Sequence, residues 1–532
     1  MEADRTSAEP TRPARFAAVL GHLAVAIAVT APLAWRANRL PLGTEPTATV
    51  PEFNLWTLEW TAQRLPHGLS GWWDAPIFWP QRGAFAFSEP QPLTGLAFAL
   101  ARPMLGNVAT YSWLIILTIA LNGLAGAAVA RRLGAGAPPA FLVGVLAQVL
   151  PFVFAQFGVF QLVVVWPLLA ATACLIAWLD EPRVRHAALL GLSLAAAVGT
   201  CGYYALLFGL CLAFAAPAAI DRTWARDWRP RVSGIVLATG VLLALAGPFA
   251  RGQQNRLSGR RWLDVTISDG SATWQDWAPG GPYWPGVPLL VLASAGLAIG
   301  RRQRSTRVLA TIGLAAFVFS LGSQLSLLGF RPWVFLTDHL DALARLRSPF
   351  RAAAVTQLML VALSAVALQW LWSRRAIPMR AAAVLLVVGA VLTSGFGPGR
   401  LAPGPPKPGT WAAWLTEHPD GKPVAFLPFA PTGAVADFQP TTTRMLQSID
   451  TGHPMVNGYS GFFPADHREL ARSLWAFPDR RSVTELQARR VGYVVVEANT
   501  WSTFDQRIAQ VLGIKVLAHD RDAYLLQVPI SD

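Results

Sequence analysis

Long apolar runs separated by short polar loops are the dominant pattern of this sequence. A helix that crosses a lipid bilayer needs about 20 mostly apolar residues. The segments that meet or approach this requirement are 16–35, 110–130, 139–157, 159–179, 187–201, 203–220, 232–250, 284–300, 308–329, 353–373 and 379–397. The pattern therefore predicts a mainly α-helical protein, a polytopic membrane helix bundle of about 11 spans.

Arginine clusters between the apolar runs predict the orientation of the bundle. Cytoplasmic loops of membrane proteins carry an excess of basic residues, and every second loop here has a cluster, such as Arg131-Arg132 and Arg301-Arg302. The amino terminus is then cytoplasmic, and the chain after the last span lies outside. Segment 90–106 (PQPLTGLAFALARPMLG) is predicted to be an interfacial helix on the outer face, because as a span it would reverse every later loop.

The pattern changes after the last apolar run. A Pro/Gly-rich linker, 398–409, is followed by shorter segments of mixed character. Helical patterns cover 411–418 and 502–513, strand patterns cover 423–429 and 491–498, and 514–520 with 524–528 reads as a hairpin. We predict a small extracytoplasmic α/β domain over 410–532, and a transmembrane domain over 1–397 that includes the first outer loop, 36–109.

Composition supports a membrane protein and excludes several other classes. Hydrophobic residues make up 53% of the chain and charged residues 14%, whereas soluble domains carry about 25% charged residues. The net charge is +14, but the arginines lie mostly between apolar runs, so lipid headgroups or phosphates are the expected partners and nucleic acid is not. The three cysteines lie in apolar stretches and form no metal-binding or disulfide pattern.

The first outer loop has the most informative pattern of acidic and aromatic residues. Helical spacing over 52–65 places the side chains of Glu52, Glu59 and Gln63 on one stripe, beside Phe53, Trp56 and Trp60. In such a helix at the membrane interface, the rings would lie among the headgroups and the carboxylates would face water. The alternative is a platform for sugar binding and acid–base chemistry, because tryptophan stacks on sugar rings and a carboxylate activates hydroxyls. The residues alone leave both explanations open.

Several motifs along the chain resemble the GT-C superfamily of polytopic bacterial membrane glycosyltransferases. They are N-x-W-x-x-x-W (54–60), FWP (78–80), SEP (88–90), ARRLG (130–134), CGYYALLFG (201–209), RLRSPFR (345–351), HPMVNGYSGFFP (453–464) and RRVGYVVVE (489–497). Their order is similar to that in uncharacterised relatives that carry a C-terminal extracytoplasmic domain. The resemblance covers almost the whole chain and implies a GT-C-like fold.

The resemblance also implies an activity and a place for its catalytic carboxylate. Enzymes of this superfamily transfer a sugar from a polyprenyl-phosphate donor to a glycan or protein acceptor, here with inversion, at the outer face of the bacterial cytoplasmic (inner) membrane. Their catalytic Asp lies in the first outer loop, where this chain has Val50. Glu52 is the nearest carboxylate, and Glu89, just before the interfacial helix, is the second candidate. A helix-start residue is the alternative explanation for Glu89.

Substrate-binding candidates come from the same motifs. Asn54, Trp56, Trp60 and Asp74 belong to the first outer loop, although Asp74 also suits a turn before Pro76. Tyr203 and Tyr204 lie at an outer hairpin tip, where they would line the acceptor cleft or anchor the interface. Arg345, Arg347 and Arg351 lie at the outer mouth of a span and would hold the donor phosphate or pair with nearby acids and headgroups. A divalent metal ion stays an open alternative as cofactor, although the sequence contains no metal-ligand pattern.

Two other functions compete with glycosyl transfer. The absence of the family Asp at position 50 favours a non-catalytic scaffold or lipid-glycan binding protein of the cell envelope. A transporter or flippase is the third alternative, but the predicted spans contain glutamines such as Gln148 and Gln357 and essentially no Asp, Glu or Lys for ion coupling. In the tail, His453, Asn457 and Tyr459 form a polar and aromatic cluster that suits a structural turn or a binding loop.

Overall fold

The computed structural model describes residues 12–529 apart from 222–223, 225, 227, 259–269, 341–342, 344–345, 347 and 375. The chain divides into two compact units. The helical unit comprises residues 1–37, 111–250 and 267–401, and the α/β unit comprises residues 38–110, 251–266 and 402–532.

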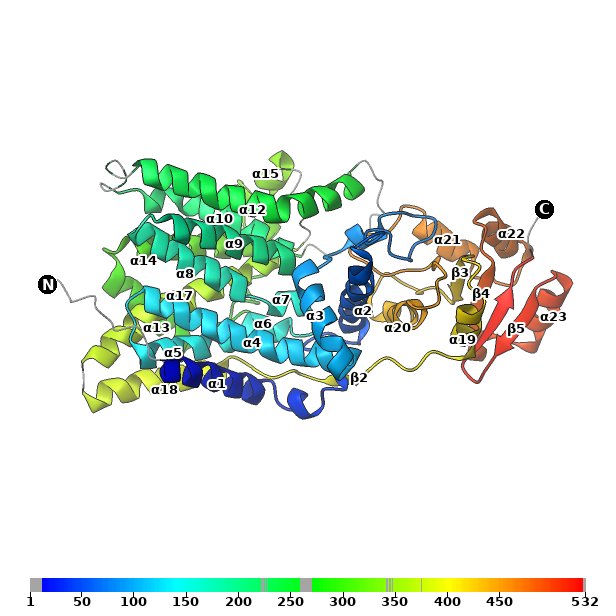
Figure 1. The fold of residues 1–532 in the computed structure, drawn as a ribbon, viewed down its shortest axis with the longest axis horizontal. Coiled ribbons are helices and arrows are strands. Elements are labelled where there is room, and N and C mark those ends of the chain that lie inside the picture. Colours follow the sequence, from blue (N-terminus) through cyan, green and yellow to red (C-terminus); the bar gives the residue numbers. More distant parts are fainter. Residues whose placement is uncertain are drawn as a thin grey trace. The chain divides into compact units, whose positions relative to one another are not determined.

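Helices account for all of the predicted spans. They are α1 (Arg12–Val29), α4 (Asn107–Arg132), α5 (Ala137–Gln148), α6 (Pro151–Ala155), α7 (Phe160–Val163), α8 (Trp166–Asp180), α9 (Val184–Thr200), α10 (Gly202–Ala219), α12 (Trp228–Leu257), α13 (Val287–Gly300), α14 (Arg304–Ser320), α17 (Ala352–Ser373) and α18 (Ile377–Thr393). Within the described residues, 7 helical segments are long and apolar enough to cross a membrane, and shorter apolar helices accompany them. The prediction of a mainly helical, multi-pass membrane protein is confirmed (Figure 1).

The core of the helical unit is built around α17. This helix packs against α5, α13, α14 and α18, and most of its side chains are buried. One of its two glutamines, Gln357, donates from Nε2 to Tyr283 O (3.0 Å) and accepts at Oε1 from Phe152 N (3.1 Å). Gln148 is likewise paired with His22 through two bonds. A bilayer offers no water, so polar groups buried in it need partners within the protein. These bonds supply such partners to the amide groups of both glutamines.

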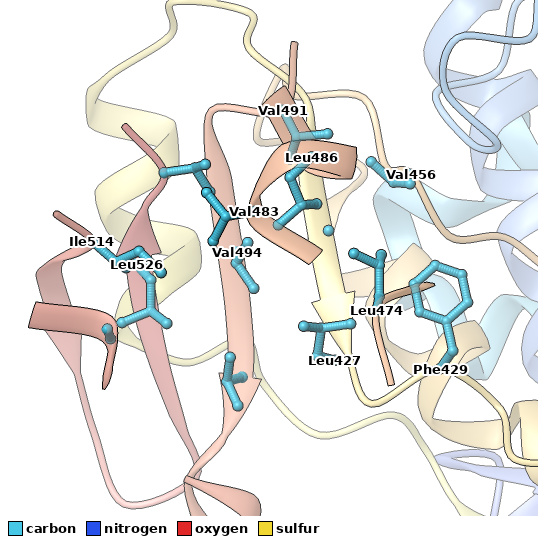
Figure 2. Packing of buried hydrophobic residues seen from close by; sticks show 14 of the residues in the cluster. Leu427, Phe429, Val456, Leu474, Val483, Leu486, Val491, Val494, Ile514 and Leu526 are labelled. Carbon is cyan, nitrogen blue, oxygen red and sulfur yellow. The ribbon is translucent and has the colours of Figure 1, made fainter. Parts of the chain in front are cut away.

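The tail of the α/β unit contains the elements that the sequence predicted. These are α19 (Thr410–Glu417), β3 (Val424–Leu427), β4 (Tyr493–Glu497), α23 (Thr503–Val511), β5 (Lys515–His519) and β6 (Ala523–Gln527). The strands form one sheet in the order β3-β4-β6-β5, with β3 parallel to β4 and the other pairs antiparallel. Helices α20 (Gln439–Ser448), α21 (His467–Ser473) and α22 (Arg480–Ala488) complete the tail. Figure 2 shows its core, where Leu486, Val494 and Leu526 are fully buried.

The first outer loop packs with the tail, whereas the sequence-based division assigned it to the transmembrane domain. Backbone hydrogen bonds explain this difference. Met455 N donates to Pro76 O (2.9 Å), Trp79 N donates to Met455 O (2.9 Å), and Phe78 N donates to Asn457 O (3.1 Å). Met455 in turn forms a parallel bridge with Val424 of β3. Segment 76–79 therefore continues the tail's sheet edge, through pairings that a local sequence pattern does not reveal.

Two helices of the first outer loop are confirmed, but the expected surroundings of one of them are wrong. The helix predicted over 52–65 is α2 (Thr49–Arg64), and the helix predicted within 90–106 is α3 (Pro92–Leu105). Helix α2 packs against α3 and α20. The Trp56 ring is therefore 1% exposed and the Glu52 side chain 2% exposed, so α2 does not present its rings to headgroups and its carboxylates to water. Both faces of the helix are covered by protein.

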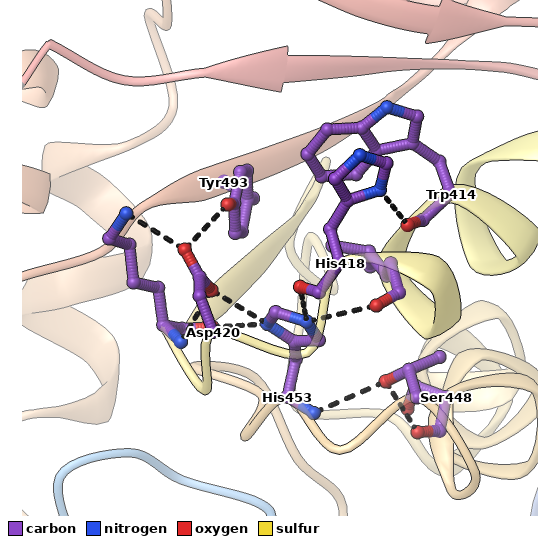
Figure 3. Close-up of polar contacts among 9 residues, drawn as sticks. Trp414, His418, Asp420, Ser448, His453 and Tyr493 are labelled. Atoms are coloured by element: carbon purple, nitrogen blue, oxygen red, sulfur yellow. Dashed lines mark hydrogen bonds and ion pairs between the residues drawn. The ribbon is translucent and has the colours of Figure 1, made fainter.

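The polar cluster of the tail is structural. His453 is fully buried, with Nδ1 2.8 Å from Lys422 O and Nε2 3.1 Å from His418 O. Figure 3 shows the ring between these carbonyls and Asp420. Asn457 Nδ2 donates to Phe426 O (2.7 Å) and its Oδ1 accepts from Phe426 N (2.7 Å). His453 holds the 453–457 segment against the loop before β3, and Asn457 holds it against β3 itself, which supports the structural turn over the binding loop.

Candidate functional site

Glu52 is the best-defined candidate for acid–base chemistry. It lies in the first turn of α2, and Thr442 Oγ1 (2.9 Å) and Thr443 Oγ1 (2.8 Å) of α20 both donate to its Oε2. Among the described residues, no group donates to Oε1. Burial raises the pKa of Glu52, and the bonds from Thr443 and Thr442 lower it by less. The result is a buried carboxyl group with one fixed oxygen and one open oxygen.

A cavity of about 580 Å³ adjoins Glu52. Its charged lining consists of Glu52, Lys407, Arg444, Glu497 and Asp522, and Trp411 contributes a ring. The guanidinium of Arg444 lies 5.4 Å from the centre of the Trp411 ring, and its Nη1 donates to Gln447 Oε1 (3.0 Å). The volume lies within the range of small-molecule sites, roughly 300–1,000 Å³. The cavity can therefore bring a polar substrate to the buried carboxyl group.

Glu59, two turns after Glu52 on α2, is a second buried acid that the sequence placed on the same stripe but did not select. It accepts at Oε1 from Asn107 Nδ2 (2.6 Å) and is 8% exposed. Burial and then the nearby charge of Asp450 raise the pKa of Glu59 to about 7, while Arg102 and the Asn107 bond oppose that rise. The sequence pattern could not single out Glu59 as a candidate acid, because one cause of its raised pKa is Asp450, which is distant in sequence. Glu45 of the same loop also has a pKa raised by burial.

The other candidates of the first outer loop occupy different surroundings. Glu89 is buried at 6% exposure, just before α3. Asn54 donates to Val50 O (2.9 Å) and accepts at Oδ1 from Gln91 Nε2 (2.9 Å), so it fixes the start of α3 against α2. Asp74 accepts at Oδ1 from Gly83 N (2.8 Å), as a turn residue does. Trp56 packs beside Phe53 and Phe85.

Trp56 and Trp60 are not open platforms for a sugar. Both rings are at least 98% covered, with exposures of 1% and 2%. Trp60 Nε1 donates to Trp72 O (2.7 Å), and the guanidinium of Arg64 lies 4.2 Å from the centre of the Trp60 ring. The expectation that free ring faces of α2 stack on sugar is therefore wrong for this conformation. The tryptophans fix α2 within the first outer loop.

The candidates of the helical unit include a partly buried cation, Arg351. The guanidinium of Arg351 lies 4.0 Å from the centre of the Tyr203 ring. Its Nε is buried and has no hydrogen-bond partner among the described residues. Tyr204 is buried and donates from its hydroxyl to Leu162 O (2.7 Å), which fixes the start of α10. Arg345 and Arg347 lie outside the described residues.

A divalent metal ion would need a group of side chains that could bind it. Within the part of the chain that the structure describes, no three His, Cys, Asp or Glu side chains lie together as metal ligands would.

Comparison with solved structures shows the fold. The arabinofuranosyltransferase AftD from Mycobacteria, solved by cryo-EM, is 16% identical with a TM-score of 0.64, and the match covers 99% of this chain and 40% of that chain. ArnT from Cupriavidus metallidurans bound to undecaprenyl phosphate is 15% identical, with a TM-score of 0.50 and coverages of 98% and 99%. The archaeal oligosaccharyltransferase AglB from Archaeoglobus fulgidus, in complex with an inhibitory peptide and a dolichol-phosphate, is 12% identical, with a TM-score of 0.51 and coverages of 93% and 70%. The chain thus spans less than half the length of AftD.

These structures confirm the predicted GT-C fold over nearly the whole chain. No curated protein sequence matches this chain. A family described as a domain of unknown function, DUF6311, matches residues 72–392, which is more than half of the 532 residues. That match begins in the first outer loop and runs through the helical unit to α18. The chain therefore belongs to the DUF6311 family.

Proposed function

We propose that this protein is a membrane glycosyltransferase that transfers a sugar from a polyprenyl-phosphate donor to a glycan or protein acceptor of the cell envelope. The observation that carries the proposal is the buried carboxyl group of Glu52 beside a 580 Å³ cavity, in a chain with the GT-C fold. The lipid class of the donor is supported by ArnT, solved bound to undecaprenyl phosphate, and by AglB, solved with a dolichol-phosphate. The reaction would take place at the outer face of the bacterial cytoplasmic membrane.

The proposed chemistry uses Glu52 as general base. Its open Oε1 takes the proton of an acceptor hydroxyl, and that oxygen attacks the anomeric carbon from the face opposite the phosphate. The bond from that carbon to the phosphate oxygen breaks, and the polyprenyl phosphate leaves with the electron pair. Because burial raises the pKa of Glu52, its carboxylate is a stronger base than an exposed one. The two threonine hydroxyls hold Oε2 and orient the group.

The donor phosphate requires a cation, and Arg351 is the described residue that suits this role. The Tyr203 ring covers one face of its guanidinium, which leaves the N–H groups at the edge free to bind phosphate oxygens. The buried, unpartnered Nε is consistent with a missing anion, because a buried donor without a partner costs about 1–3 kcal/mol. Arg345 and Arg347, from the same motif, belong to this proposal on the sequence alone.

A non-catalytic lipid-glycan binding protein is the second candidate, and one observation favours it. Where GT-C enzymes have their catalytic Asp, this chain has Val50. The two hydroxyl bonds on Glu52 also join α2 to α20, so the glutamate would have a structural use even without catalysis. The two candidates differ in one respect: only the enzyme needs a titratable group at position 52.

Complementation of a deletion strain tests the proposal. Surface glycans are analysed by mass spectrometry in the deletion strain and after expression of the wild type, Glu52→Gln or the control Glu417→Gln, which changes an exposed residue at the end of α19. Loss of a general base lowers rates about 10²–10⁴-fold, so Glu52→Gln should fail to restore the missing glycan, whereas Glu417→Gln should restore it. Unchanged glycans in both the deletion strain and the Glu52→Gln strain would refute glycosyl transfer. Restoration by Glu52→Gln would instead support the binding protein.

A further inference from the structure

The α/β unit contains a second cavity, of about 460 Å³. It lies between the end of α2, the loop 74–82 and the turn 448–454. The residues of its lining that matter here are Trp60, Arg64, Asp74, Trp79 and Arg82. None of its lining residues belongs to the Glu52 cavity, so it is a separate site within the same unit.

Arg64 gives this cavity an unsatisfied cation. Its guanidinium is held against the Trp60 ring at 4.2 Å, which fixes the orientation of its N–H groups. Its Nε is buried and, among the described residues, has no hydrogen-bond partner. A buried N–H without an acceptor costs about 1–3 kcal/mol, which an oxygen atom of a ligand would recover. A planar guanidinium with free N–H groups suits a carboxylate or a phosphate.

The remaining lining adds a ring and a further positive charge. Trp79 is half-buried, and its Nε1 donates to Arg489 O (3.0 Å), which fixes the ring. A fixed, partly open indole provides a face for a sugar ring. Arg82 is exposed at the cavity. Asp74 has one oxygen bonded to Gly83 N, and its second oxygen can accept from a sugar hydroxyl.

We propose that the cavity lined by Trp60, Arg64 and Trp79 binds an anionic saccharide, a sugar ring that carries a carboxylate or a phosphate. Arg64 binds the anionic group, and Trp79 packs against the ring. The volume lies in the usual range for a small-molecule site, roughly 300–1,000 Å³. The site holds a charged glycan apart from the Glu52 cavity, and its occupancy requires neither a donor lipid nor catalysis.

Binding measurements on the full-length protein in detergent test this site directly. The probes are glucuronate, glucose 6-phosphate, neutral glucose and inorganic phosphate, and the binding of each is measured by calorimetry. Glucuronate, glucose 6-phosphate or both should bind at least about tenfold more tightly than glucose and inorganic phosphate, which corresponds to about 1.4 kcal/mol. The member of the charged pair that binds more tightly identifies the anionic group. Equal affinity for glucose would exclude the role of the cation, and equal affinity for inorganic phosphate would exclude the sugar platform. Absence of binding by all probes would refute the site.

Matched variants identify the residues responsible. Arg64→Gln should weaken binding of the charged sugar by at least about tenfold, and Arg480→Gln, an exposed arginine at the start of α22, should not change it. Trp79→Leu is the second variant, because it removes the proposed sugar face and leaves Arg64 in place if Arg64→Gln unfolds the protein. Trp79→Leu should weaken binding of the charged sugar, and unchanged affinity in a folded Arg64→Gln protein, or in Trp79→Leu if Arg64→Gln does not fold, would overturn the proposal. This result is independent of Glu52→Gln, since no transfer is measured.

Discussion

At the residue scale, helix α2 carries two buried acids, Glu52 and Glu59, whose hydrogen-bond partners and neighbouring charges differ. Glu52 has two hydroxyl donors on one oxygen, whereas Glu59 has an amide donor, Asn107, and the nearby negative charge of Asp450. Asp450 itself accepts from Gln63 Nε2 (2.6 Å), one turn after Glu59. Burial raises the pKa of both acids, but the bonds from Thr443 and Thr442 oppose that rise at Glu52, whereas the charge of Asp450 adds to it at Glu59.

The raised pKa of Glu59 predicts a pH-dependent stability. Its pKa is 4.5 in the unfolded chain and about 7 in the folded one. The contribution of Glu59 to stability is therefore full below about pH 4.5 and is lost as the pH rises towards 7, by up to about 3 kcal/mol. Glu59→Gln keeps an oxygen for Asn107 and removes this loss. Thermal unfolding in detergent at pH 5 and pH 8 should show a smaller decrease for Glu59→Gln than for the wild type. Equal decreases would contradict the assignment, and Glu417→Gln is the control.

The sequence identified the acidic stripe but not its surroundings. The spacing of Glu52 and Glu59 predicts one helical face, and α2 confirms the helix. Which partners cover that face depends on Thr442 and Thr443, which follow Glu52 by 390 and 391 residues. Periodicity reports only local geometry, so a half-exposed interfacial helix and a fully buried helix give similar patterns. For the same reason, the sequence did not reveal that protein covers the rings of Trp56 and Trp60.

At the element scale, the tail was predictable and its association with the first outer loop was not. Strands such as β4, with its run of buried valines, and helices such as α23, with an amphipathic pattern and a Ser502 cap, carry local signals. The segment 76–79 carries no such signal, because it begins with Pro76, is followed by Pro80 and has no strand period. It joins the tail through three backbone bonds to 455–457, which are contacts between distant parts of the sequence.

Close packing at this junction predicts a strong effect of a single methyl group. A Cβ added at Gly458 would lie 2.8 Å from the Phe78 ring, and Phe78 is 1% exposed. Gly458→Ala should therefore destabilise the α/β unit by about 1–3 kcal/mol, as overpacking of a core does. Gly433→Ala is the matched control, because its Cβ would meet no atom within 4 Å. Thermal unfolding of both variants measures the difference, and equal stabilities would contradict the tight junction.

At the scale of the whole molecule, the α/β unit constrains the membrane topology. Its members 38–110, 251–258 and 402–529 are held together by direct bonds, such as Gln253 Nε2 to Ser88 O (2.9 Å) and Met455 N to Pro76 O (2.9 Å). Segments that bond to one another lie on the same side of a membrane. An even number of spans must then separate them. The predicted spans between 110 and 250, and those between 110 and 397, are both even in number, which agrees with the arginine pattern and with α3 as a helix that does not cross.

Labelling of single cysteines tests this topology. In a background without the native Cys174, Cys201 and Cys211, cysteines replace Ser70, Thr484 and Arg302, all exposed. Intact cells treated with a membrane-impermeant maleimide should label the first two, because the α/β unit is proposed to lie outside. Arg302→Cys, between α13 and α14, should be labelled only after permeabilisation. Different labelling of Ser70→Cys and Thr484→Cys would contradict the shared side. Labelling of both only after permeabilisation would place the Glu52 cavity in the cytoplasm, where an extracytoplasmic glycosyl transfer has no access to its acceptor.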